Sequence, residues 1–269
     1  MRHTIIIPHR NRNDQLELCL WSILRSADAT QCKGLEVLVV EHGSTVCPVA
    51  PDDRVRVIVD DRHMPSGTIK TRIGEVKHYR NAFCKSRLLN LGIEHARGEV
   101  VTILDADAVV ALRWTCCAEV LLHSPRLRRV AYRVRYLDKR MTGVLYGGDR
   151  RVLLDHLFAH YDDYDLAWEA YGHPQENKRQ SGEPWGNSQF SMRRQDIGGL
   201  RYDEGYIGKG LEDIDFNRQV YEKFGDTFRG AIFTHGDAAM FHLRHDYDQE
   251  RWASNAFQIA NADRYSRTL

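Results

Sequence analysis

Two aspartates one residue apart, Asp105 and Asp107, directly follow the apolar run VVTIL at residues 100–104. Such a run is typical of a strand buried on both faces of a parallel sheet. If the chain stays extended, both carboxylates lie on one side and Ala106 points away. Two neighbouring carboxylates raise each other's pKa unless a cation neutralises them. The pattern predicts Mn²⁺ or Mg²⁺ bridging them to a substrate diphosphate, and the alternative is a solvated loop with a chance D-x-D.

A second polar group follows the first apolar run, in the segment IIIPHRNR at residues 5–12. Pro8 is predicted to end this strand, and Arg10 and Arg12 to lie on one side of an extended turn. Guanidinium groups form paired hydrogen bonds with phosphate oxygens. The segment therefore predicts phosphate binding, with an ordinary charged loop as the alternative.

Three acidic residues, Glu212, Asp213 and Asp215, open a predicted helix behind a glycine-rich loop at residues 205–210. Carboxylates stabilise the first turn of a helix, so capping explains part of this pattern. Three acids in four residues are more than a cap requires. An aspartate of ordinary pKa is ionised near neutral pH and can accept a proton from a hydroxyl nucleophile. The segment therefore predicts a general base.

Two histidines, His242 and His245, lie in the segment FHLRHDYD at residues 241–248. Side chains three residues apart on a strand face opposite ways, so at most one is expected at the site. His245, near the end of the strand, is favoured as a metal ligand through its neutral imidazole, and His242 is the second choice. A histidine unrelated to metal is the alternative for each.

These residues must be positioned by alternating strands and helices, which predict an α/β fold, Rossmann-like in its first half with a mostly parallel sheet. Ligands of such sheets bind outside the carboxyl ends of the strands. Residues 60–80 are predicted to be a long mobile loop, and residues of about 149–182 an insertion. Predicted strands cover residues 4–7, 35–40, 55–59, 100–104, 187–191 and 238–243, and predicted helices cover residues 14–26, 81–97, 193–197, 212–224 and 250–264.

The composition is that of a soluble globular protein, with 269 residues, 42% hydrophobic residues, 28% charged residues and a net charge of +1. No global field favours nucleic acid or an anionic membrane. No stretch approaches the roughly 20 apolar residues of a transmembrane helix, and the N-terminus MRHTIIIPHRNR lacks the features of a signal peptide or anchor. Six irregularly spaced cysteines indicate reduced thiols and a cytoplasmic, soluble protein, whether or not its acceptor is membrane-bound.

Together, the four motifs are similar to those of GT-A glycosyltransferases, and more narrowly resemble the β-1,4-galactosyltransferase group and its bacterial relatives of the chondroitin-polymerase type. IIIPHRNR is similar to that group's IIPFRNR, and FCKSRLLNLGI at residues 83–93 to its FNRAKLLNVGF. LDADA matches the D-x-D motif, residues 186–220 end in the same E-D and F-N-R, and FHLRHD matches the strand with the metal histidine. The resemblance implies one GT-A domain over residues 1–269, with a nucleotide-sugar-binding half at 1–110 and an acceptor and catalytic half at 111–269.

The resemblance also implies site residues. Glu41 would contact uracil, Phe83 and Lys85 would flank the base, and Asp105 would touch ribose or metal. Asp107 and a histidine, His245 or His242, would bind Mn²⁺. Asp213 would be the general base, and Glu212 would bind the acceptor or donor sugar. The nucleotide pocket would comprise Pro8, Arg10, Arg12, Glu41, Phe83, Lys85 and Asp105.

The implied activity is metal-dependent, inverting transfer of a hexose or N-acetylhexosamine from a UDP-sugar to a hydroxyl of a glycan or other acceptor. Lys209 replaces the family's acceptor-platform tryptophan, which leaves a negatively charged acceptor open. Trp185 is expected to shape the donor-sugar pocket, and the segment after His245 to form a lid. One alternative is an NDP-sugar nucleotidyltransferase, although PHRNR lacks the glycine-rich phosphate loop of that class. The other is a non-catalytic nucleotide-sugar- or carbohydrate-binding module.

Overall fold

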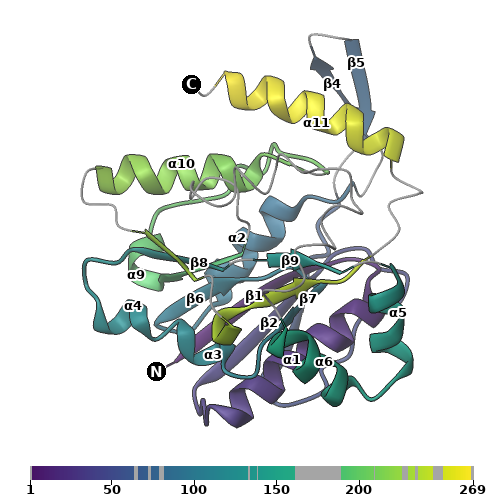
Figure 1. The fold of residues 1–269 in the computed structure, drawn as a ribbon. Coiled ribbons are helices and arrows are strands. Elements are labelled where there is room, and N and C mark those ends of the chain that lie inside the picture. The colour runs from purple at the N-terminus through teal and green to yellow at the C-terminus, as the bar shows by residue number, and fades with distance from the viewer. Residues whose placement is uncertain are drawn as a thin grey trace.

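A computed structural model of the chain describes residues 2–63, 66–71, 74–78, 82–132, 134–137, 139–160, 189–208, 210–225, 230–233, 236–244 and 251–267. Its centre is a seven-stranded sheet in the order β11-β8-β10-β6-β1-β2-β3 (Figure 1). The strands β3, β2, β1 and β6 are parallel, whereas β10 runs antiparallel to both β6 and β8. The bounds are β1 (His3–His9), β2 (Leu35–Glu41), β3 (Val55–Val59), β6 (Val100–Ile103), β8 (Arg129–Tyr132), β10 (Phe190–Arg193) and β11 (Gly230–Phe233).

The described residues also form two smaller sheets. In the three-stranded one, β12 (Met240–His242) lies between β7 (Ala108–Val110) and β9 (Val134–Tyr136). In this sheet, β7 directly follows the D-x-D motif and β12 contains His242. The other is an antiparallel ribbon of β4 (Gly67–Thr71) and β5 (Gly74–His78), against which α11 (Arg251–Ser266) lies (Figure 1).

Helices cover both faces of the large sheet, which gives the chain a three-layer core. Residues of β1 show why its sequence is continuously apolar: Ile5 and Ile7 belong to one buried cluster and Ile6 to the other. Successive side chains of a strand face opposite ways, so a strand covered on both faces needs no polar alternation. One layer contains α1 (Asn13–Ala29), α3 (Trp114–Cys117), α4 (Val120–His123), α5 (Lys139–Gly147) and α6 (Arg150–Ala159), and the other contains α2 (Lys85–His95), α9 (Arg194–Ile197) and α10 (Glu212–Phe224).

The predicted α/β class and the mostly parallel first half are confirmed, as is the helix at residues 212–224. The prediction that Pro8 ends the first strand is wrong, because β1 continues to His9. The carbonyl of Ile6 accepts a bond from Leu104 N, so Pro8 presents its nitrogen on the same side, where β6 has already ended. No ladder hydrogen bond is lost there, and proline is tolerated.

Three further boundaries differ from the prediction. The segment expected to be a mobile loop at residues 60–80 contains the β4–β5 ribbon, whose register pairs Gly67 with His78. The helix predicted at 81–97 is shorter and ends at His95. Of the strand predicted at 187–191, the described residues include β10, which runs on to Arg193. The start of the expected insertion is α6, which buries Leu154 and Leu157 in the core, and residues 161–182 lie outside the described residues.

All six cysteines are free thiols, as their irregular spacing in the sequence predicted. Within the described ranges, no helix is both long enough and apolar enough to cross a membrane.

Gly92 of α2 permits close contact between this helix and β1. A methyl group at this position would overlap Cγ2 of Ile6, a fully buried residue. We therefore expect Gly92→Ala to lower the free energy of unfolding by about 1–3 kcal/mol, the usual cost of overpacking a core.

Gly143 of α5 is the matched control, because nothing lies within 4 Å of its added methyl group. Gly143→Ala should raise stability by about 0.5–1 kcal/mol through helix propensity. Urea unfolding measures both, and a Gly92→Ala protein as stable as the wild type contradicts the close packing.

Candidate active site

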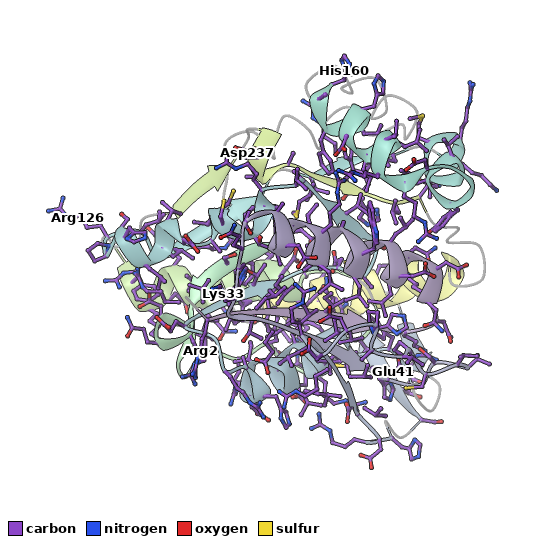
Figure 2. The ribbon with its side chains drawn as sticks, turned by 90° about the horizontal axis from the view of Figure 1, so that it is seen from below. Arg2, Lys33, Glu41, Arg126, His160 and Asp237 are labelled. Atoms are coloured by element: carbon purple, nitrogen blue, oxygen red, sulfur yellow. The ribbon has the colours of Figure 1, made fainter. Side chains whose placement is uncertain are left out.

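The candidate site lies at the carboxyl edge of the parallel strands. Because β1, β2 and β6 run in the same direction, the segments that follow His9, Glu41 and Ile103 meet at this edge. Figure 2 shows Glu41 there, with Arg2 and Lys33 at the opposite edge. The antiparallel strand β10 begins where β6 ends, so Gln189, just before β10, also reaches the site.

The D-x-D motif forms a turn between β6 and β7, closed by a hydrogen bond of 3.2 Å from Ala108 N to Asp105 O. The expectation of an extended segment is therefore wrong, because the chain must reverse here to pair β7 with β12. Asp107 is almost fully buried, with 1% of its side chain exposed. One of its carboxylate oxygens accepts from the Arg12 guanidinium, and the other lies 3.2 Å from His242 Nε2.

Asp105 is held by two partners from distant parts of the chain. The Lys85 ammonium, at the start of α2, lies 2.6 Å from one carboxylate oxygen. The Gln189 amide donates to the other oxygen at 2.6 Å, and its carbonyl accepts from Asp105 N at 2.9 Å. Burial alone would raise the pKa of Asp105, but the adjacent Lys85 holds it below its ordinary value. Asp105 is therefore an oriented, ionised carboxylate.

Two acids on the first turn of α10 join the same cluster. Glu212 is buried, and its carboxylate lies 3.9 Å from the Lys85 ammonium. Asp213 is partly buried, and one of its oxygens accepts from Ile214 N at 2.9 Å. Burial, reinforced by the negative charge of Glu212, raises the pKa of Asp213 to about 7. Lys85 thus bridges two acidic segments that are more than a hundred residues apart in the sequence.

The third acid of this segment, Asp215, belongs to the structure of the helix. Its carboxylate pairs with Arg218 at 2.8 Å and accepts from Gln219 at 3.0 Å. These i,i+3 and i,i+4 contacts are ordinary helix-surface pairs. Helix pairing therefore accounts for Asp215, and of the three acids only Glu212 and Asp213 belong to the site.

The glycine-rich loop before α10 is fixed by its neighbours. Gly208 N donates to the carbonyl of Phe83 at 2.9 Å, which ties the loop to the start of α2. Gly208, Gly210 and Leu211 have positive φ values of 74°, 106° and 71°. Only Leu211 carries a conformational cost for this, and such strain commonly accompanies functional loops. The loop therefore presents Glu212 and Asp213 in one defined direction.

The remaining predicted nucleotide-pocket residues lie at the same edge. Pro8 is buried in β1, Arg10 is partly exposed after it, and Phe83 is partly exposed before α2. Glu41 is buried, and its carboxylate oxygens accept from His9 and from Ser44 N. His245, Lys209 and Trp185 lie outside the described residues, as does the start of the predicted lid at residues 246–250.

Sequence reasoning missed four side chains at this edge. Asp60 directly follows β3 and pairs with Arg87 at 2.5 Å, so the strand-end rule that identified Asp105 could also have identified Asp60. His9 also follows an apolar run, but its bond to Glu41 depends on the register of β1 against β2. Gln189 carried no such signal, because its position depends on the direction of β10. The missed residues are His9, Asp60, Arg87 and Gln189.

The donor set suits a hard divalent cation. His242 Nδ1 donates to Leu243 O at 2.9 Å, so Nε2, which lies 3.2 Å from the Asp107 carboxylate, is the ring nitrogen that faces the site. A carbonyl that fixes the second ring nitrogen is a common feature of metal-binding histidines. In the described part of the chain, no three His, Cys, Asp or Glu residues are arranged as a complete metal cage. Asp107 and His242 would hold Mn²⁺ only with further oxygen ligands, as from a substrate diphosphate.

Comparisons with known proteins bear on the family and the fold. Residues 4–116 match the model of Glycosyl transferase family 2. The matched segment is similar to this family and makes up less than half of the chain. It contains the predicted phosphate-binding arginines, Lys85 and both aspartates of the D-x-D motif. No curated protein sequence matches the chain.

Solved glycosyltransferase structures share the fold. S. aureus TarS (residues 1–349) in complex with UDP-GlcNAc is 14% identical, with a TM-score of 0.56, and the match covers 92% of this chain and 60% of that one. M. tuberculosis glucosyl-3-phosphoglycerate synthase in complex with phosphoglyceric acid is 16% identical, with a TM-score of 0.54 and coverage of 99% and 79%. The same synthase in complex with Mn²⁺, UDP and phosphoglyceric acid is 15% identical, with a TM-score of 0.52, and the match covers 99% of this chain and 78% of that one. The chain, which spans 60% of the length of that TarS structure, therefore has the GT-A fold.

Proposed function

We propose that the chain is a divalent-metal-dependent glycosyltransferase that moves a hexose or N-acetylhexosamine from a UDP-sugar to an acceptor hydroxyl. One observation carries this proposal: Lys85 joins the D-x-D carboxylate Asp105 to the α10 acid Glu212 at the carboxyl edge of a GT-A sheet. The family 2 segment and the relatives solved with UDP-GlcNAc, or with Mn²⁺ and UDP, support the donor class. The narrower kinship with β-1,4-galactosyltransferases rests on the ordered motifs alone.

The cluster would divide its work between donor binding and catalysis. Arg10 and Arg12 would contact the diphosphate, and Asp105, oriented by Gln189, would meet the ribose or the metal. Bound to Asp107 and His242, Mn²⁺ would supply the positive charge that stabilises UDP as a leaving group. Lys85 would hold Asp105 and Glu212 close together, and Glu212 would accept hydrogen bonds from a sugar hydroxyl.

Asp213 would act as the general base. Its carboxylate would take the proton of the acceptor hydroxyl while that oxygen attacks the anomeric carbon and the bond to UDP breaks. A single displacement of this kind inverts the configuration of the sugar. A base with a pKa near the working pH combines a sizeable ionised fraction with good proton affinity. The raised pKa of Asp213 suits this role.

The pKa of Asp213 predicts the pH profile of the reaction. The base must be deprotonated, so kcat/KM should rise with pH, fall about tenfold per unit on the acid side, and level off above about 7. Initial rates from pH 5.5 to 8.5, at fixed Mn²⁺ and low donor concentration, measure the apparent pKa. A profile that is flat down to about pH 5 would mean a base of ordinary carboxylate pKa and would contradict the role of Asp213.

UDP release from a panel of UDP-sugars, with Mn²⁺ and candidate acceptors, tests the activity itself. Transfer to an acceptor supports the proposal. Pyrophosphate release from UTP and a sugar phosphate would instead show a nucleotidyltransferase. Donor binding with neither reaction would show a non-catalytic module.

A further inference from the structure

His9 and Glu41 form a buried pair at the carboxyl edge of the sheet. They are register partners on the adjacent parallel strands β1 and β2. His9 Nδ1 donates to Glu41 Oε2 at 2.5 Å, and the second carboxylate oxygen accepts from Ser44 N at 2.6 Å. Burial alone would raise the pKa of Glu41, but these bonds hold it below the ordinary value. Both oxygens of the residue expected at the uracil are therefore used within the protein.

The other nitrogen of His9 reaches the arginine loop. With Nδ1–H donated to Glu41, Nε2 carries the lone pair and accepts from Arg12 N at 3.3 Å. Two further bonds join the loops: Asn11 N donates to Ser44 Oγ at 2.7 Å, and Thr45 N donates to Asn11 Oδ1 at 2.8 Å. Asn11 itself has a left-handed φ of 53°, a conformation that asparagine tolerates better than most residues. The loop thus has one backbone path.

This backbone path fixes the side chain that touches the D-x-D motif. Arg12 donates to Asp107, whose carboxylate is buried and faces His242. The contacts therefore run from Glu41 through His9 and Arg12 to Asp107, across the ends of three neighbouring strands. Outer-shell groups that orient metal ligands through hydrogen bonds commonly control metal affinity.

We infer that His9 and Glu41 are positioning residues, which set the place of Arg12 and through it the orientation of the Asp107 carboxylate for Mn²⁺ and diphosphate. The inference rests on the proposed function, since it concerns the same donor site. It reassigns Glu41 from a contact with the base to a support of the metal ligand.

The test compares His9→Phe with His3→Phe. The two histidines lie at opposite ends of β1, and both are buried, but His3 bonds Thr102 at the edge away from the site. Mn²⁺ binding to the folded protein with UDP is measured by the electron paramagnetic resonance of free Mn²⁺. We expect His9→Phe to weaken Mn²⁺ binding about 10–100-fold, as loss of an outer support does. His3→Phe should lower thermal stability but keep the Mn²⁺ affinity within about twofold of the wild type, a much smaller change than the 10–100-fold expected for His9→Phe.

His9→Asn replaces His9→Phe if the phenylalanine protein does not fold, because the asparagine amide retains the donor to Glu41 and loses the acceptor for Arg12 N. Unchanged Mn²⁺ binding in a folded His9 variant overturns the inference, and so does equal weakening by His3→Phe. Failure of the wild type to bind Mn²⁺ and UDP would instead count against the proposed function.

A metal-free measurement keeps the two failures apart. His9 and Asp107 are linked through Arg12, so the shifts of the urea midpoint caused by His9→Phe and Asp107→Asn should be non-additive. The shifts caused by His3→Phe and Asp107→Asn should add. Additivity in both pairs overturns the inference whatever the protein binds.

Discussion

Replacing Asp213 by asparagine is expected to lower kcat by about 10²–10⁴-fold, the usual contribution of a positioned general base. Asparagine retains the oxygen that accepts from Ile214 N, so α10 keeps its first turn. The loss should therefore fall on kcat, with little change in the affinity for the donor. Steady-state rates with a saturating UDP-sugar measure it.

Asp215→Asn is the matched control, since Asp215 lies two residues further along the same helix and pairs with Arg218. This variant should lose some stability and keep kcat within about threefold, far from the loss caused by removing a base. An Asp213→Asn enzyme that turns over at the wild-type rate would remove Asp213 from the mechanism.

The same substitution should leave a signature in stability. Burial raises the pKa of Asp213 to about 7, so between about pH 4 and 7 the folded chain holds a proton that the unfolded chain has lost. The free energy of unfolding of the wild type therefore falls as pH rises through this window. Asparagine has no such proton, so Asp213→Asn should gain stability relative to the wild type from pH 4 to 7 and hold that gain above it. If the difference in Tm between Asp213→Asn and the wild type is the same at pH 4 and at pH 7, Asp213 has an ordinary pKa.

Asp107→Asn is expected to cause the second large loss. Removal of a direct ligand should weaken Mn²⁺-dependent UDP binding by at least the 10–100-fold that loss of an outer support costs. The side chain is buried between Arg12 and His242, and asparagine fits the same volume without the charge. Calorimetric titration of UDP at a fixed Mn²⁺ concentration gives the affinity.

Asp52→Asn provides the comparison for this loss. Asp52 precedes β3 and pairs with Arg54, so removal of its charge breaks an ion pair outside the proposed site. Its UDP affinity should match that of the wild type. If Asp107→Asn and the wild type bind UDP with equal affinity in the presence of Mn²⁺, then Asp107 is not a ligand of the metal.

The sequence predicted those parts of the site that follow from strand ends. Asp105, Asp107 and the arginines each directly follow a buried apolar run, and parallel strands bring their ends to one edge. The acids of α10 were predicted because a helix start needs no more than local information.

Other features depended on pairings that one sequence does not display. The clamp of Gln189 on Asp105 requires β10 to be antiparallel, and the bond between His9 and Glu41 requires the register of β1 against β2. The turn at Asp105–Asp107 exists because β7 leaves the large sheet to pair with β12. Long-range pairing, rather than local propensity, decided each of these.

Thermal unfolding of the wild type with a panel of UDP-sugars, each with and without Mn²⁺, tests the central claim most directly. A ligand at about 100 times its dissociation constant adds roughly 2.7 kcal/mol to the free energy of unfolding. The account predicts that at least one UDP-sugar stabilises the protein only when Mn²⁺ is present, and that Asp107→Asn abolishes this shift. Stabilisation by none of them, with or without Mn²⁺, would contradict it.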